Sequence, residues 1–362
     1  MTEPQQDIEK PWWTVSHGPG PVVATAIHDG HDVRPEVASA MALDDAGRLR
    51  EEDPFTGQAV LGVPAHVIVH RSRFEFDLNR GADSAVYETS EQSWGLEVWH
   101  GGSCGRALTE RSLAIHAEYY RSLAGLLDGV AARHQRFLVI DVHSYNHRRD
   151  GPDAAPTPQE KAPDINIGTF SMPREQWAFL VDPLMEAMAD FDFNGRKLDV
   201  RENIAFQGKG EQTRFVHDRY PGRGCAIALE FKKFFMDEWT GEPDPAELEA
   251  MRRFITFIAP RAEALLGKCA ALRFASRPTR SSPSSRRPER CARRSAPADA
   301  CISTGRCISS SCIAPPTRRT ASPGASRRTA RPIWCGTRRT TSPPHRRCAR
   351  WWRRCASISA MC

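Results

Sequence analysis

Residues 136–148 read RFLVIDVHSYNHR, a run of apolar and β-branched side chains that ends in polar and histidine side chains. A continuous apolar run of this length predicts a strand that is buried on both faces of a sheet. Further strands are predicted within residues 21–30, 65–80, 163–170, 197–206 and 223–231.

Stretches with apolar residues at helical spacing lie between these strands, within residues 107–134, 172–191 and 244–268. Asp244 is placed to cap the last of these helices. Strands that alternate with helices predict an α/β fold, in which helices cover both faces of a mixed, mostly parallel sheet.

The composition changes sharply near residue 270. The last 92 residues contain 21 arginines and two acidic side chains, a net charge of about +19, whereas the first 270 residues carry about −13. The last part is also poor in aliphatic residues, so it cannot bury enough apolar surface to fold. We therefore predict an N-terminal extension (1–19), a folded domain (20–269) and a tail (270–362) that is disordered or arises from out-of-frame translation.

The remaining sequence-wide features point to a cytoplasmic protein. No apolar stretch is long enough to span a bilayer, and the N-terminus lacks the basic-then-apolar pattern of a secretory signal. The three cysteines before residue 270 suit reduced thiols. The basic tail contains no lysine and no regular aromatic spacing, so we do not expect a nucleic-acid partner.

Polar side chains follow the apolar part of four predicted strands. Because the carboxyl ends of parallel strands meet at one sheet edge, we expect these side chains to lie close together. They are His28, Asp29, Asn79, Arg80, Asp141, His143, Ser144 and Glu230. Imidazoles suit zinc, and a catalytic zinc takes three protein ligands and keeps one open position. His28 and His143 are therefore the predicted metal ligands.

A carboxylate is the usual third ligand. Residues 51–53 supply two candidates, Glu52 and Asp53, and the sequence does not decide between them. Asp141 lies two positions before His143 and is predicted to orient that imidazole. A single histidine after a strand more often makes local hydrogen bonds, so the metal prediction depends on the pair.

Three further polar positions suit hydrolysis. Glu230 ends an apolar strand, where a carboxylate is costly to bury unless it has a partner or a task. It is predicted to act as the general base, with a salt bridge to Lys232, Lys233 or an arginine as the alternative. Arg80, with Asn79 beside it, is predicted to bind a substrate carboxylate. His217, in a segment predicted to be rich in turns, is placed to polarise a carbonyl group.

These segments together resemble the N-formylglutamate amidohydrolase family over about residues 20–268. The matching segments are AIHDG (26–30), FEFDLNR (74–80), IHAEYYRSL (115–123), IDVHS (140–144), PDINIGTF (163–170), NIAFQGKG (203–210), RFVHDRYPG (214–222) and ALEFKKFFMDE (228–238). The chain departs from the family pattern at Asp29, in EEDPFTG and in the split glycines Gly208 and Gly210, which leaves the substrate less defined than the metal site.

The resemblance implies a three-layer α/β/α sandwich like that of the zinc-carboxypeptidase-like hydrolases. It also implies one divalent metal ion, for which Zn²⁺ is the first candidate. It implies hydrolysis of a small acidic N-acyl amino acid, with N-formyl-L-glutamate as the first candidate. The roles it implies are metal binding by His28, His143 and Glu52 or Asp53, orientation by Asp141, substrate binding by Arg80, Asn79 and Asn203, and catalysis by Glu230 and His217. The alternatives are a metallocarboxypeptidase-like peptide hydrolase and a binding module without activity.

Overall fold

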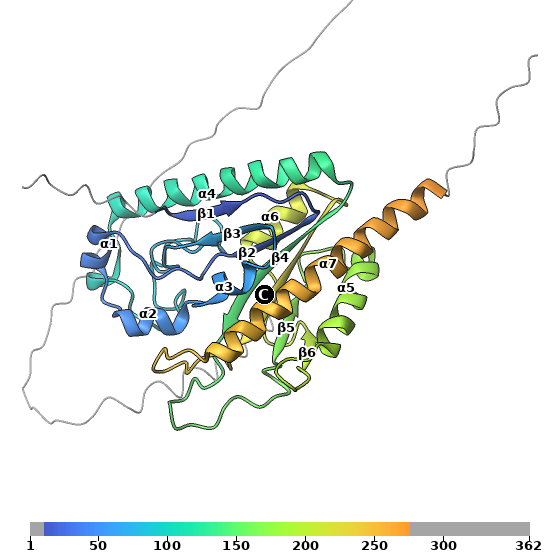
Figure 1. Cartoon of the computed structure of the whole chain (residues 1–362). Helices are drawn as coiled ribbons and strands as arrows, with labels where there is room; N and C mark the ends of the chain where they lie inside the picture. Colours follow the sequence, from blue (N-terminus) through green and yellow to red (C-terminus); the bar gives the residue numbers. More distant parts are fainter. Residues whose placement is uncertain (1–10, 276–362) are drawn as a thin grey trace, which may run out of the picture. The chain divides into compact units, whose positions relative to one another are not determined.

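The computed structural model describes residues 11–275, and the side chains of residues 11–268. A seven-stranded sheet forms its centre, in the order β1-β3-β2-β4-β7-β5-β6 (Figure 1). The strands are β1 (Trp13–Ser16), β2 (Val22–Ala26), β3 (Ala65–Val69), β4 (Phe137–Tyr145), β5 (Ile165–Gly168), β6 (Val200–Glu202) and β7 (Gly224–Lys232). The α-helices are α1 (Pro35–Ala40), α2 (Asp45–Glu51), α3 (Thr56–Val60), α4 (Arg106–Arg133), α5 (Arg174–Asp190), α6 (Glu211–Arg219) and α7 (Pro245–Ala275).

The sheet has the mixed, mostly parallel topology that the sequence predicts. Strands β3, β2, β4 and β7 are parallel neighbours, and β6 is parallel to β5. Only β1 on β3 and β5 on β7 pair antiparallel among the described strands. The carboxyl ends of β2, β4 and β7 therefore lie at one edge of the sheet, where parallel sheets bind their ligands.

Helices cover both faces of this sheet (Figure 1). Because strand side chains alternate between faces, Leu138 and Ile140 of β4 pack in a core with α3, α5 and α7. Their neighbours Phe137 and Val139 pack on the opposite face with α4 and α6. The predicted three-layer α/β/α sandwich is thus confirmed.

The three predicted helices are found as α4, α5 and α7. The predicted cap of the last one is also confirmed, because Asp244 Oδ1 accepts hydrogen bonds from the backbone N–H groups of Ala246 and Glu247, at 2.9 and 3.2 Å.

The structure departs from the sequence-based expectations at two places. Residues 13–16, in the predicted N-terminal extension, form the edge strand β1, and Trp13 packs against the core beside α4. The segment around His217, predicted to be rich in turns, is the helix α6. The pairing of β1 with β3 is a contact between distant parts of the chain, which no local pattern records. At α6, the turn residues that follow the helix dominate the local pattern.

The predicted tail lies almost entirely outside the described residues, since the description ends with α7 at Ala275. Within residues 11–275, no helix is both long enough and apolar enough to cross a bilayer.

Candidate metal centre and active site

Two buried histidines meet at the carboxyl edge of the sheet. His28 lies two residues beyond the end of β2, and His143 lies near the end of the neighbouring parallel strand β4. Their ring centroids are 5.0 Å apart. Asp53 joins them from the loop between α2 and α3, where its backbone N–H donates to the carbonyl oxygen of His28. Three segments that are distant in sequence thus bring two imidazoles and one carboxylate together.

The ligand atoms of this cluster are spaced as a small metal site requires. The Oδ2 atom of Asp53 lies 3.2 Å from Nδ1 of His28 and 3.1 Å from Nδ1 of His143. Tetrahedral coordination with bonds of about 2.0–2.2 Å places neighbouring ligand atoms about 3.4 Å apart. One ligand atom from each residue lies within 4.8 Å of the other two. The three side chains therefore fit a divalent ion in number, type and spacing.

Each imidazole has its second nitrogen on another buried carboxylate. Nε2 of His28 lies 2.8 Å from Asp77 Oδ1, and Nε2 of His143 lies 3.0 Å from Asp141 Oδ2. Metal-binding histidines have such carboxylate partners, which fix the orientation of the ring and leave the other nitrogen facing the ion. The arrangement leaves Nδ1 of both rings directed at Asp53.

Asp141 is held in turn by Thr25 and Gln212, which donate hydrogen bonds of 2.8 and 2.6 Å to its Oδ1. Asp141 thus lies beside His143, where the sequence places it, and its orienting role stays a prediction.

Burial and neighbouring charges shift the pKa values of this cluster. Burial raises the pKa of Asp53, but hydrogen bonds from His143 and His28 outweigh burial and hold it far below its usual range. Burial lowers the pKa of His143, yet the charges of Asp141 and Glu230 raise it well above its usual value. The Asp53 carboxylate is therefore held ionised between the two imidazoles, the form in which a carboxylate binds a cation.

The structure separates the two carboxylates that the sequence left as alternatives. The Glu52 carboxylate accepts a hydrogen bond from Ser72 and lies 2.6 Å from Nδ1 of His31, away from the His28–His143 pair. Asp53 alone of the two faces both imidazoles. Asp53, and not Glu52, therefore completes the group of three side chains that could hold a metal ion.

Glu230 lies directly beside His143, because the two residues are register partners on β7 and β4. It is 7% exposed, and no hydrogen bond reaches its carboxylate from the described residues. Burial, together with the charges of Asp53 and Asp141, raises its pKa to about 8, although His143 opposes the shift. A carboxyl group with so high a proton affinity suits proton transfer next to a metal site.

A narrow cleft of about 90 Å³ opens over this cluster. Much of its wall is formed by cationic, amide and aromatic side chains that were not predicted as site residues from the sequence. They are Arg73, Arg149, Lys233, Asn146, Trp94, Tyr145 and Phe206. The polar run NHRR directly after the His143 strand was a signal for two of them, Asn146 and Arg149.

Only one member of the predicted substrate-binding pair lines the cleft. Asn79 does so, with its amide packed so closely on Gly210 that a β-carbon there would lie 1.8 Å from Asn79 Oδ1. Arg80 instead donates to the carbonyl oxygen of Gln92 and lies 3.4 Å from Asp77. The lining residues include Arg73 and Arg149 in its place.

Asn203 has a structural position rather than the predicted one beside the substrate. Its amide bridges the loop after β6 to Thr169, with hydrogen bonds of 3.0 and 2.9 Å. It is not among the residues of the cleft, although it steadies the loop that brings Phe206 there. The turn at Asn203 has a φ of 57°, a left-handed conformation that asparagine tolerates.

His217 lies away from the cleft, in contrast to its predicted place near the scissile carbonyl. Its Nε2 accepts the backbone N–H of Ala226, and its Nδ1 lies 3.1 Å from the Ser171 hydroxyl. Ala226 is four residues before Glu230 on β7, a separation of about 13 Å along a strand. Burial lowers the pKa of His217 to about 4, as expected for a neutral core histidine.

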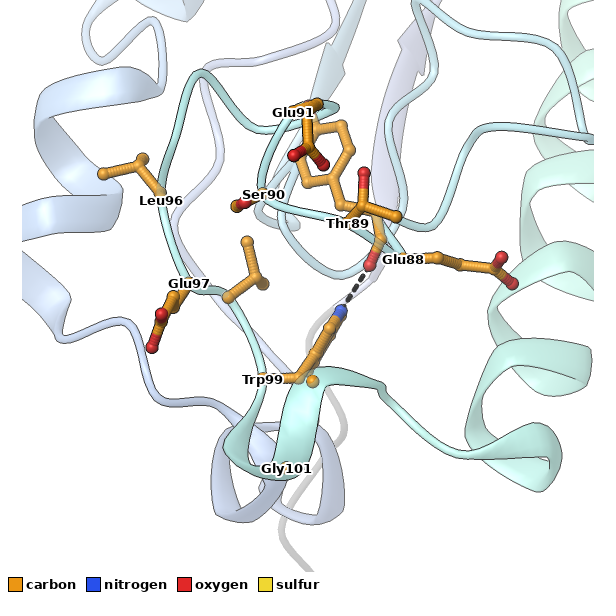
Figure 2. Close-up of a pocket in the computed structure, with 11 residues that line it drawn as sticks. Glu88, Thr89, Ser90, Glu91, Leu96, Glu97, Trp99 and Gly101 are labelled. Atoms are coloured by element: carbon orange, nitrogen blue, oxygen red, sulfur yellow. Dashed lines mark hydrogen bonds between the residues drawn. The ribbon is translucent and has the colours of Figure 1, made fainter. Parts of the chain in front are cut away.

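A second cavity, of about 430 Å³, is formed by the loop between β3 and α4 (Figure 2). Its wall carries the side chains of Glu88, Glu91 and Glu97, and the Trp99 indole donates to the Tyr87 carbonyl oxygen. Its described lining contains neither histidine nor cysteine, so we assign it no role in the chemistry.

Comparison with known proteins gives an independent result. The chain is similar in structure to N-formylglutamate amidohydrolase from Ralstonia eutropha JMP134, with a TM-score of 0.55 and 14% identity over 71% of this chain and 98% of that chain. A gene product of Agrobacterium tumefaciens, Atu2144, has a TM-score of 0.49 and 15% identity over 72% of this chain and 96% of that chain. No curated protein matched the sequence. Residues 20–236 match the family model of N-formylglutamate amidohydrolase, and the chain therefore belongs to that family.

Proposed function

We propose that the chain is a metal-dependent amidohydrolase that binds one divalent ion through His28, Asp53 and His143. The first candidate for this ion is Zn²⁺. The proposed reaction is hydrolysis of a small acidic N-acyl amino acid, and the first candidate is N-formyl-L-glutamate, giving L-glutamate and formate. One observation carries this proposal: two buried imidazoles direct Nδ1 at Asp53, each with its Nε2 on a further carboxylate, immediately beside Glu230.

The bound ion would polarise the acyl oxygen and acidify a water molecule. Glu230 would take a proton from that water molecule while the oxygen of the water forms a bond to the acyl carbon. Glu230 would then deliver the proton to the amide nitrogen as the carbon–nitrogen bond breaks, so that the products are a carboxylic acid and an amine. The raised pKa of Glu230 supports its acceptance of the proton, and the charge of an ion held by His28, Asp53 and His143 would favour the later release of that proton.

The acidic part of the substrate would bind to Arg149. The side chain of Arg149 is 26% exposed and lines the cleft, and it contacts Glu51 through Nη1 alone, at 3.2 and 3.4 Å. The rest of its guanidinium group can form the paired hydrogen bonds that carboxylates favour. Arg80 remains the anchor proposed from the family motif, so the two arginines are alternatives for this role.

The test is formate release by the full chain, purified and supplied with Zn²⁺. We expect release from N-formyl-L-glutamate, its loss on treatment with a chelator and its recovery when Zn²⁺ is restored. Arg149→Gln should lower kcat/KM for N-formyl-L-glutamate more than for N-formyl-L-glutamine, which has the same shape without the side-chain charge. An equal loss for both substrates would assign the anchor elsewhere, and Arg80→Gln is the matched comparison.

Two results would contradict the proposed function. A purified chain that releases amino acids from peptides but no formate would be a peptide hydrolase on the same scaffold. A chain that neither binds Zn²⁺ nor hydrolyses any N-acyl amino acid would be a binding module.

A further inference from the structure

The strongest unexplained feature of the cleft is the side chain of Asn146. This residue follows β4 directly, lines the cleft with His143 and Glu230, and is 6% exposed. Its Nδ2 donates a hydrogen bond of 2.9 Å to the carbonyl oxygen of Arg50. Its Oδ1 is fully buried and accepts no hydrogen bond from any residue that the structure describes. A buried acceptor without a donor costs free energy that a bound ligand can recover.

The orientation of this amide follows from its one partner. Rotation by 180° would place Oδ1 against the carbonyl oxygen of Arg50, so that two acceptors faced each other. The atom of this amide that is left without a partner among the described residues is therefore the oxygen. Asn79 has a similar unpaired Oδ1 in the cleft, but no hydrogen bond fixes which way its amide points among the described residues.

The chemistry of the proposed substrate indicates what Asn146 accepts. An ionised N-formyl amino acid with an acidic side chain has carboxylate and formyl oxygens, which only accept hydrogen bonds. Its one N–H group, on the nitrogen of the bond to be broken, is its only hydrogen-bond donor. We propose that Oδ1 of Asn146 accepts a hydrogen bond from this N–H group. The contact would favour amides over other acyl substrates, which lack the N–H group. This inference rests on the proposed function and adds a specificity residue to it.

Such a contact would also help the proton transfer. In the amide, the nitrogen lone pair is shared with the carbonyl group. When the acyl carbon becomes tetrahedral, the nitrogen becomes pyramidal and its lone pair is free to accept a proton. An acceptor that holds the N–H on one side leaves the lone pair on another side, where Glu230 can protonate it as the carbon–nitrogen bond breaks.

Asn146 also has a structural contact, which the test must separate from this role. The carbonyl oxygen of Arg50 accepts a second hydrogen bond, of 2.6 Å, from Nζ of Lys233, which also donates to the carbonyl oxygen of Glu52. Both side chains thus hold the segment that leads into Asp53. Lys233→Met removes this support without removing the unpaired acceptor and is the matched control.

The experiment compares two substrates that differ in one group. N-formyl-L-glutamate contains the N–H, and the formyl ester of 2-hydroxyglutarate has an oxygen in its place. The zinc-loaded full chain, Asn146→Ala, the similarly sized Asn146→Leu and Lys233→Met are assayed for formate release, with zinc content and thermal unfolding measured for each. Two variants at Asn146 guard against failure of one to fold.

We expect both Asn146 variants to lower kcat/KM about tenfold more for the amide than for the ester, the size of one hydrogen bond made to the substrate. Lys233→Met should lower the two values by the same factor. Equal losses for amide and ester in the Asn146 variants would show that Asn146 only supports the Arg50 segment. Unchanged activity of the Asn146 variants would also overturn the inference. So would an amide-selective loss that appears in Asn79→Ala instead of in the Asn146 variants. Wild-type protein without formate release from the amide would overturn the proposed function itself, and this inference with it.

Discussion

Replacement of Asp53 by asparagine tests the proposed metal centre most directly. Asp53 Oδ2 lies 3.1–3.2 Å from Nδ1 of both imidazoles, and the residue is 2% exposed. The substitution keeps the shape of the side chain and removes its charge. The zinc affinity should therefore fall, while the fold is retained.

The size of this effect has a lower bound. A unit negative charge and a divalent ion about 2.1 Å apart attract each other by about 4 kcal/mol even at the dielectric constant of bulk water. The buried cleft screens charges less than water does, so the loss should be at least this large. A difference of about 4 kcal/mol corresponds to about a thousandfold in Kd.

The matched control is Glu52→Gln. This neighbouring carboxylate is also buried, but it contacts Ser72 and His31 instead of the imidazole pair. Titration of the metal-free proteins with Zn²⁺, followed by calorimetry and elemental analysis, should show near wild-type affinity for Glu52→Gln and at least a thousandfold loss for Asp53→Asn. A folded Asp53→Asn protein that binds Zn²⁺ within tenfold of wild type would refute the assignment, as would equal losses in the two variants.

Three further predictions concern the residues around this centre. Glu230→Gln should retain zinc but lower kcat for formate release by about 10²–10⁴-fold, the usual contribution of a general base, and undiminished turnover would exclude that role. Asp77→Asn should weaken zinc binding about 10–100-fold through its contact with His28, measured by competition with a chelator, and an unchanged Kd would refute the orienting role. His217 has a pKa of about 4 in the folded chain and about 6.5 when unfolded, so the unfolded chain binds more protons between these values. His217 should therefore contribute a fall of about 3 kcal/mol in the free energy of unfolding as the pH drops from 6.5 to 4. His217→Gln should reduce the slope measured by urea unfolding, and an equal slope would contradict a neutral buried imidazole.

Much of the fold could be predicted because it depends on local patterns. The alternation of apolar runs and helical spacing indicated the sheet and its two helical layers, since each element must bury its apolar side chains against another layer. The edge strand β1 escaped prediction because its pairing with β3 is a long-range contact. The helix α6 was missed because the turn residues that follow it dominate the local pattern.

The sequence by itself determined that His28, His143 and Glu230 come together, because parallel strands end at one sheet edge and each of these residues lies near a strand end. Only the tertiary structure chose Asp53 over Glu52, brought Arg149 and Asn146 into the cleft and placed His217 in the core. Loop side chains follow no periodic sequence pattern that would predict where they point. Lys233 and Asn146 donate hydrogen bonds to the backbone of the segment that leads into Asp53, and these contacts between distant parts of the sequence form only when the chain folds.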